Sequence, residues 1–186
     1  MDKERLKQIT REFLNEIGED ILREGLKDTP VRVSRMYEEV FKGYDEIKKP
    51  KITVFPNNTD GIHMDEMIID TGNFFSFCEH HLLPFWGKYY FGYIPEQKVV
   101  GLSKIARLIE WYCSRLQVQE RLTKQIVDEL EKELDPHGIA LILKARHFCK
   151  EMRGIKQVGG EMITTDMRRA FRTNINTRQE FLQLIK

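Results

Sequence analysis

The chain has 186 residues, of which 41% are hydrophobic and 32% charged, and its formal net charge is +1. This composition is typical of a globular protein, and the length suits one domain or a small domain with an appendage. The small net charge gives no reason to expect a nucleic acid or a membrane surface as partner, and no apolar run approaches the length of a membrane span. Three cysteines do not suit a disulfide framework and no secretory signal opens the chain, so we expect reduced thiols in a cytoplasmic protein.

The first part of the chain predicts helices followed by a loop. Apolar residues recur at helical spacing over residues 3–26. Thr29 as N-cap and Pro30 as first helical residue predict a second helix, which ends at Gly43. Residues 44–64 are rich in turn-forming side chains and predict a loop. The apolar stripes of these helices have packing spacing, which favours a scaffold or an oligomer contact over chemistry.

A strand predicted over residues 64–77, with an interruption at Gly72-Asn73, leads into a cluster of reactive side chains. Cys78, His80 and His81 follow within four residues. Cys78 and His81 are three residues apart, so a single turn directs both toward the same point. A second strand, rich in aromatic residues, is predicted over residues 86–94.

Two helices are expected after these strands. The first opens near Gly101 with Ser103 as N-cap. Ser103 and Lys104 at a helix N-terminus suit a phosphate, although the residues alone favour an ordinary cap with a solvated lysine. The second helix has apolar residues at four-residue spacing from Leu122 to Leu134.

Alternating apolar residues from Gly138 onward predict another strand, with a second Cys/His pair at its end. His147 and Cys149 are two residues apart and share a face if the strand continues through them. Two cysteines and one histidine fill three tetrahedral positions on Zn²⁺ and leave the fourth open for water, as in catalytic sites. Spacing alone leaves a closed, four-ligand structural site equally open. Because the chain offers five candidate ligands, two histidines remain as proton carriers.

The C-terminal part predicts one more strand and a helix. Residues 161–175 are strand-like, and Thr177 with Glu180 has the spacing of a capping box for a short final helix. The order of elements is helices, two strands, two helices, two strands and a helix. This order predicts an α+β fold with a largely antiparallel sheet.

Six motifs occur in the order found in the GTP cyclohydrolase I family, which the chain resembles over most of residues 65–185. The motifs are Cys78-Glu79-His80-His81, Tyr93-Ile94-Pro95, residues 101–107, residues 117–123, His147-Phe148-Cys149 and Met152-Arg153-Gly154. The resemblance implies a tunnelling fold, which is an antiparallel four-stranded sheet with helices on one face, preceded by an N-terminal helical region. Residues 1–60 would form that region, and residues 61–186 a single catalytic unit.

The resemblance also implies an assembly and a reaction. Subunit sheets would join into a ring, two pentamers would stack into a homodecamer, and active sites would lie between subunits. The reaction would convert GTP and water into 7,8-dihydroneopterin triphosphate and formate, the first step of folate and pterin biosynthesis. Neither a nucleic acid nor a membrane is an expected partner.

The resemblance assigns roles to three groups of side chains. The implied zinc ligands are Cys78, His81 and Cys149. The implied acid–base groups are His80, His147 and Ser103. The implied substrate contacts are Glu120, Gln119, Lys104, Arg107 and Arg153.

These implied roles have chemical reasons. Zinc lowers the pKa of water so that it can attack C8 of guanine, and His147 is expected to protonate N7. His80, with Ser103, would handle protons in the later sugar rearrangement. A carboxylate at Glu120 suits the N1–H and 2-amino donors of guanine, with Gln119 assisting. Guanidinium and ammonium groups suit the triphosphate.

Some residues depart from the family pattern, and two alternatives stay open. Lys150, Arg168 and Arg169 are departures that bear on loop geometry and subunit packing. One alternative is a non-catalytic purine- or pterin-binding member or a closed zinc module, against which both proton-carrying histidines argue. The other is a different tunnelling-fold enzyme, such as a nitrile reductase or pyruvoyl-tetrahydropterin synthase. The Cys-Glu-His-His and Gln-Glu-Arg-Leu-Thr motifs argue against it.

Overall fold

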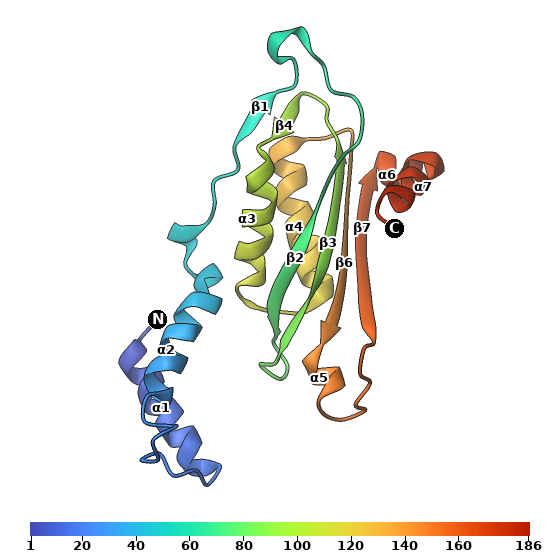
Figure 1. Cartoon of the computed structure of the whole chain (residues 1–186). Coiled ribbons are helices and arrows are strands. Elements are labelled where there is room, and N and C mark those ends of the chain that lie inside the picture. The colour runs from blue at the N-terminus through green and yellow to red at the C-terminus, as the bar shows by residue number, and fades with distance from the viewer.

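An antiparallel sheet of four long strands forms the centre of the computed structural model, which describes residues 1–186 (Figure 1). In spatial order, the strands are β2 (Ile68–Cys78), β3 (Pro84–Ile94), β6 (Gly138–His147) and β7 (Glu161–Arg169). A two-residue strand, β5 (Leu116–Gln117), pairs in parallel with the end of β2. The predicted α+β class with a largely antiparallel sheet is confirmed.

The sequence suggested an interruption at Gly72-Asn73, but β2 pairs with β3 continuously from Ile68 to Phe77. Gly72 has a packing role instead. A Cβ atom at this position would lie 2.6 Å from Cε1 of Tyr89 on the neighbouring strand. The glycine therefore lets the aromatic ring lie directly over the strand, and the Tyr89 hydroxyl donates to Asp70 at 2.9 Å.

Two helices cover one face of the sheet, as expected for the predicted fold. These are α3 (Leu102–Cys113) and α4 (Gln119–Leu134). Alternate residues of β6, such as Leu141 and Leu143, point into a core of 22 buried residues shared with both helices. The alternation that predicted the strand therefore also selects the residues that face the core.

The C-terminal helices pack against the opposite face of the sheet, at one end. β7 ends at Arg169 and is followed by α6 (Ala170–Thr173) and α7 (Ile175–Leu184), so the predicted strand-like stretch 161–175 is too long. Phe171 and Phe181 form a small second core with residues of β6. The predicted capping box is wrong, because the Asn174 side chain caps α7 by accepting from the backbone of Asn176 and Thr177.

The two arginines that depart from the family pattern connect β7 to α4. Arg168 Nη1 lies 2.7 Å from Glu131 Oε2, and Arg169 Nη2 lies 2.6 Å from Asp135 Oδ1. Arg169 has a positive φ of 52°, which an arginine adopts only when its surroundings hold it there. The ion pairs supply that restraint, so these departures have a structural explanation.

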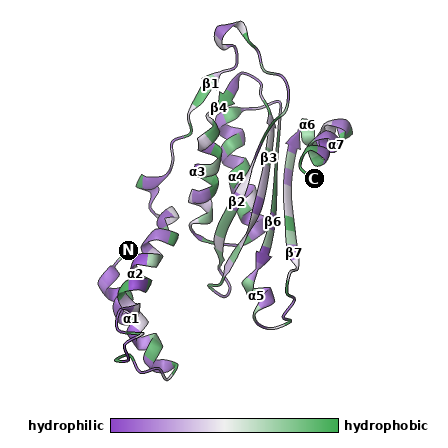
Figure 2. Ribbon diagram, in the orientation of Figure 1, coloured by the Kyte–Doolittle hydropathy of each residue, from purple (hydrophilic) through white to green (hydrophobic).

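The N-terminal region forms a pair of helices that extends away from the sheet (Figure 1). The helices are α1 (Lys3–Glu16) and α2 (Thr29–Val40), so the helix predicted over residues 3–26 is too long. The chain turns after α1, where Gly18 has a φ of +84°. The N-cap of α2 is Asp28 rather than Thr29, with Pro30 in the first turn. Figure 2 shows mainly hydrophilic residues along this pair, with scattered apolar ones.

The segment between α2 and β2, predicted as loop, contains several short elements. They are the 3₁₀ turns Lys42–Tyr44, Glu46–Lys48 and Thr59–Gly61, and the strand β1 (Val54–Pro56). β1 pairs with β4 (Lys98–Val100), which ties it to the sheet-bearing part of the chain. The division at residue 60 stays a prediction. No helix has both the length and the apolar character needed to cross a bilayer.

Candidate metal centre and active site

A tight turn at the end of β2 brings Cys78 and His81 together. The backbone N–H of Cys78 donates to Leu83 O at 2.8 Å, and that of Leu82 donates back to Cys78 O at 2.9 Å. Leu82 adopts a left-handed conformation with φ of 55° to close the turn. The predicted convergence of these two ligand candidates is therefore confirmed.

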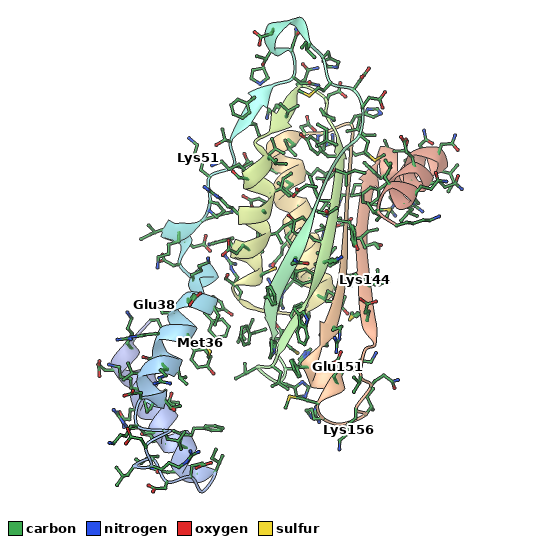
Figure 3. All side chains as sticks on the ribbon, in the orientation of Figure 1. Met36, Glu38, Lys51, Lys144, Glu151 and Lys156 are labelled. Atoms are coloured by element: carbon green, nitrogen blue, oxygen red, sulfur yellow. The ribbon has the colours of Figure 1, made fainter.

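Cys149 joins them by a different route from the one predicted. β6 ends at His147, and Cys149 lies on the single helical turn α5 (Phe148–Glu151), so the two residues do not share a strand face. The turn is tied back to β6 because Glu151 makes a two-pronged ion pair with Arg146, at 2.8 and 2.7 Å. Figure 3 shows Glu151 at this end of the sheet. The turn directs the thiol toward Cys78 and leaves the imidazole of His147 free for another contact.

The ligand atoms of Cys78, His81 and Cys149 all lie within 4.8 Å of one another. Ligand atoms around a tetrahedral zinc ion, with bonds of about 2.0–2.3 Å, are separated by roughly 3.3–3.8 Å, so a small adjustment would close the set. Burial and the adjacent Cys78 thiol raise the pKa of the Cys149 thiol. A bound cation reverses that effect and favours thiolates. Two soft sulfur donors with one imidazole fit zinc and leave one position for water.

His147 lies beside this cluster in a constrained position. Its ring stacks on Phe85, with centroids 4.6 Å apart and planes inclined by 2°. Its Nε2 atom lies 2.8 Å from Oε1 of Gln119. Burial lowers the pKa of His147, while the Glu120 carboxylate opposes that shift. Phe85 has no sequence signal that connects it to the site, because the contact is set by the register of β3 against β6.

His80 lies on the open side of the turn. It is exposed, and its Nδ1 atom is 3.7 Å from the sulfur of Cys78. The intervening Glu79 forms an ion pair with Arg121, which lowers the pKa of that carboxyl. Arg121 also donates to Gln117 Oε1 at 3.1 Å, and its ion pair with Glu79 ties the turn that carries Cys78 and His81 to α4. Arg121 lies within a motif that the sequence singled out, but its partner could not be read from spacing.

Arg153 reaches the same cluster from the loop after α5. Its Nη1 atom lies 2.8 Å from Nε2 of His81. The predicted triphosphate contact thus comes close to the metal ligands within one chain. Glu120 is exposed in the first turn of α4, next to Gln119 and near His147.

The remaining predicted site residues, Ser103, Lys104 and Arg107, lie toward the other end of α3. Cys78 pairs with Gln117, beyond the C-terminal end of α3, whereas Ser103 lies in its first turn. Twelve helical residues span about 18 Å, so Ser103 and Lys104 do not meet the metal cluster of their own chain, while Arg107 lies near the middle of the helix. Figure 1 shows the N-terminal end of α3 beside β4 and its other end toward the tip of the sheet that carries α5.

The predicted N-cap role of Ser103 is wrong. Gly101 is the N-cap of α3, with extended φ and ψ of −64° and 124°, and Ser103 makes no capping hydrogen bond. Ser103 and Arg107 are exposed and Lys104 is half-buried. The first turn of α3 therefore presents the Ser103 hydroxyl and the Lys104 ammonium group, and Arg107 follows near the middle of the helix.

The chain is similar to known proteins over nearly its whole length. A family model described as GTP cyclohydrolase I matches residues 6–186. The chain is 45% identical over 186 residues to GTP cyclohydrolase 1 of Aquifex aeolicus (strain VF5), which covers 100% of this chain and 98% of the relative. It is 43% identical over 188 residues to GTP cyclohydrolase 1 of Bacillus subtilis (strain 168), which covers 100% and 97%.

Among solved structures, the chain is partly similar to the archaeosine synthase QueF-Like in the apo form. The TM-score is 0.45 at 14% sequence identity, over 54% of this chain and 91% of the other. A likeness this partial carries no functional argument.

Proposed function

The chain belongs to the GTP cyclohydrolase I family, and on that premise we propose that it hydrolyses the imidazole ring of GTP, with formate and 7,8-dihydroneopterin triphosphate as products. The observation that carries the proposal is a three-ligand cluster, Cys78, His81 and Cys149, beside the half-buried His147. The cluster lacks a fourth protein ligand, which favours a catalytic site over a closed structural one.

The three ligands would hold zinc through two thiolates and one imidazole. When bound, the ion would lower the pKa of a water molecule toward neutrality. The proposal requires a reducing compartment such as the cytoplasm, because Cys78 and Cys149 must remain thiolates, and both are free in the structure.

The acid–base steps fall to histidines on either side of the cluster. His147 would donate a proton to N7 of guanine while water adds at C8. The C8–N9 bond then breaks to leave a formamide, and a second water cleaves the C8–N7 bond, so that C8 leaves as formate with two water-derived oxygens. His80, exposed at the open side of the turn, would move protons during the sugar rearrangement and the ring closure that releases water. One water is consumed overall for each formate.

Recognition of the purine would rest on Glu120. Its exposed carboxylate, close to His147, can accept from both N1–H and the 2-amino group of guanine. Adenine presents a different edge, without the N1–H and without the 2-amino group. A carboxylate that faces adenine gains neither of these hydrogen bonds and meets the N1 acceptor instead, so we expect discrimination against ATP.

Binding of the triphosphate would require a second subunit. Ser103 and Lys104 lie at the far end of α3 from the metal cluster of their own chain and Arg107 lies near its middle, so a neighbouring chain would supply them. Arg153, near His81 in the same chain, would meet the phosphates from the other side. This division of labour supports a homo-oligomer, and the decamer of two stacked pentamers is the form we propose.

A single assay tests the reaction. Zinc-loaded protein is incubated with GTP, formate is measured enzymatically, and the oxidised product is read by pterin fluorescence. We expect both signals in equal amounts with GTP and neither with ATP. Formate without pterin would restrict the activity to ring opening, and the absence of both signals from zinc-loaded protein would refute the proposed function.

A further inference from the structure

The side-chain amide of Gln119 is buried and has a full set of partners. Gln119 is 1% exposed. Its amide nitrogen lies 2.9 Å from Leu143 O, 3.0 Å from Met162 O and 3.1 Å from Thr164 Oγ1. Its amide oxygen lies 2.8 Å from Nε2 of His147. No donor remains for a guanine, so this geometry does not favour the substrate contact predicted for Gln119 from sequence.

These partners decide which way the amide points. Leu143 O and Met162 O are main-chain carbonyls, which can only accept hydrogen bonds. A flipped amide would place its oxygen against both carbonyls, so that acceptors would face one another without a hydrogen between them. The nitrogen must therefore face the strands, and the oxygen must face His147.

An amide oxygen can only accept, so the nitrogen of His147 that faces it must carry the hydrogen. That nitrogen is Nε2. Stacking on Phe85 holds the ring plane. In a neutral imidazole with Nε2–H, the lone pair lies on Nδ1, and Nδ1 is the atom free to gain or lose a proton.

We propose that Gln119 is a positioning residue that holds the ring of His147 with Nε2–H toward its amide oxygen, so that Nδ1 is the ring nitrogen presented to the substrate. The part concerning the substrate rests on the proposed function. In the proton-donating state both ring nitrogens carry hydrogen. Transfer of the Nδ1 proton to N7 leaves the neutral Nε2–H form, and the Nε2–H···Oε1 bond is kept throughout.

The first measurement is a spectroscopic signature of the wild-type, zinc-loaded protein. With ¹⁵N-labelled histidine, protonated and unprotonated ring nitrogens give well-separated resonances, and His147→Asn assigns the signal by its loss. At a pH where imidazole is neutral, we expect Nε2 of His147 to be the protonated nitrogen. A signal for the Nδ1–H form would overturn the proposal, whatever the activity.

The second measurement uses Gln119→Met, which keeps the volume of the side chain and removes its acceptor. We expect kcat to fall by roughly a hundredfold, with KM changed by less than about threefold, because the histidine loses its defined tautomer. The Nε2–H signature should be lost as well. An unchanged kcat with a raised KM would instead make Gln119 a substrate contact and overturn the proposal.

Thr164→Val is the matched control. It removes one acceptor of the Gln119 nitrogen and the 2.6 Å contact with Thr123, but leaves the Gln119–His147 hydrogen bond in place. We expect it to keep the ring signature and kcat within about threefold of wild type. If Gln119→Met does not fold, the ¹⁵N signature of His147 in the wild-type protein still tests the proposal. A wild-type protein that holds zinc but releases no formate would contradict the proposed reaction, whereas an active protein with the Nδ1–H form would contradict only this inference.

Discussion

The two ends of α3 differ in how much of the candidate site one chain completes. Beyond its C-terminal end, Cys78, His81, Cys149 and His147 are held by a tight turn, an ion-paired helical turn and a buried amide. At its N-terminal end, Ser103 is exposed and makes no capping bond within the chain. The groups beyond the C-terminal end of α3, here called the metal end, are held in place by contacts within the chain. The groups at its N-terminal end, here called the basic end, are not.

This difference separates two requirements of the proposed reaction. Proton transfer and metal binding need groups fixed within a fraction of an ångström, which local turns and buried hydrogen bonds provide. A flexible triphosphate needs positive charge within reach, which long side chains on a neighbouring subunit can provide. In the proposed reaction, the metal cluster of one chain would carry out the chemistry and the basic side chains of α3 from a neighbouring chain would hold the triphosphate.

Removal of a metal ligand should have the largest effect. Cys149→Ala is expected to lose stoichiometric zinc and to lower formate release by more than roughly a thousandfold, because two ligands leave a weak, open site. Zinc is measured by elemental analysis and formate by the coupled assay. Cys113→Ala is the control, since Cys113 is buried in the core and lies outside the metal cluster, and it should keep both.

Retention of stoichiometric zinc by Cys149→Ala would mean that His80 or His147 is a ligand. The assignment of these two histidines as acid–base groups would then be wrong.

A mixing experiment tests whether the two ends come from different chains. Cys149→Ala and the double variant Lys104→Ala with Arg107→Ala are each expected to be nearly inactive at low GTP. If they are unfolded together and refolded, about one quarter of the sites would combine an intact metal end with an intact basic end from the neighbour. Formate release should recover to about that fraction of wild type.

No recovery, with assembly verified by sedimentation, would place both ends of each site in the same chain.

The smallest expected effect concerns the stability of α3 itself. Ser103→Ala should change the free energy of unfolding by less than about 0.5 kcal/mol, because Gly101 is the N-cap and Ser103 is exposed. Loss of a true serine N-cap costs about 1 kcal/mol. Urea unfolding of the assembled protein distinguishes the two values, and the larger one would restore Ser103 as the cap.

Sequence patterns predicted the local parts of the site and missed those that depend on packing. The three-residue spacing of Cys78 and His81 was sufficient, because one turn determines their geometry. The convergence of Cys149 was predicted for the wrong reason, since strand alternation does not continue past His147. The orientation of Gln119 depends on carbonyls of two strands and could not be inferred from any spacing.

The same limit applies to the fold. Alternation and helical periodicity predicted the sheet and the two helices that cover it, because burial repeats along each element. The caps of α2, α3 and α7 were each displaced by one to three residues from their predicted positions. Several residues near each helix end can serve as caps, and the packing of neighbouring elements selects among them.

The sheet has two open edges. β7 pairs only with β6, and the outer edge of β2 is paired only at Phe77 and Cys78. Unpaired strand edges of this length invite pairing with another chain. If neighbouring copies meet there, as the proposed ring requires, the fraction of folded protein depends on association between subunits. The stability of this protein would then depend on its concentration, and dilution alone would weaken it without altering any contact inside a subunit.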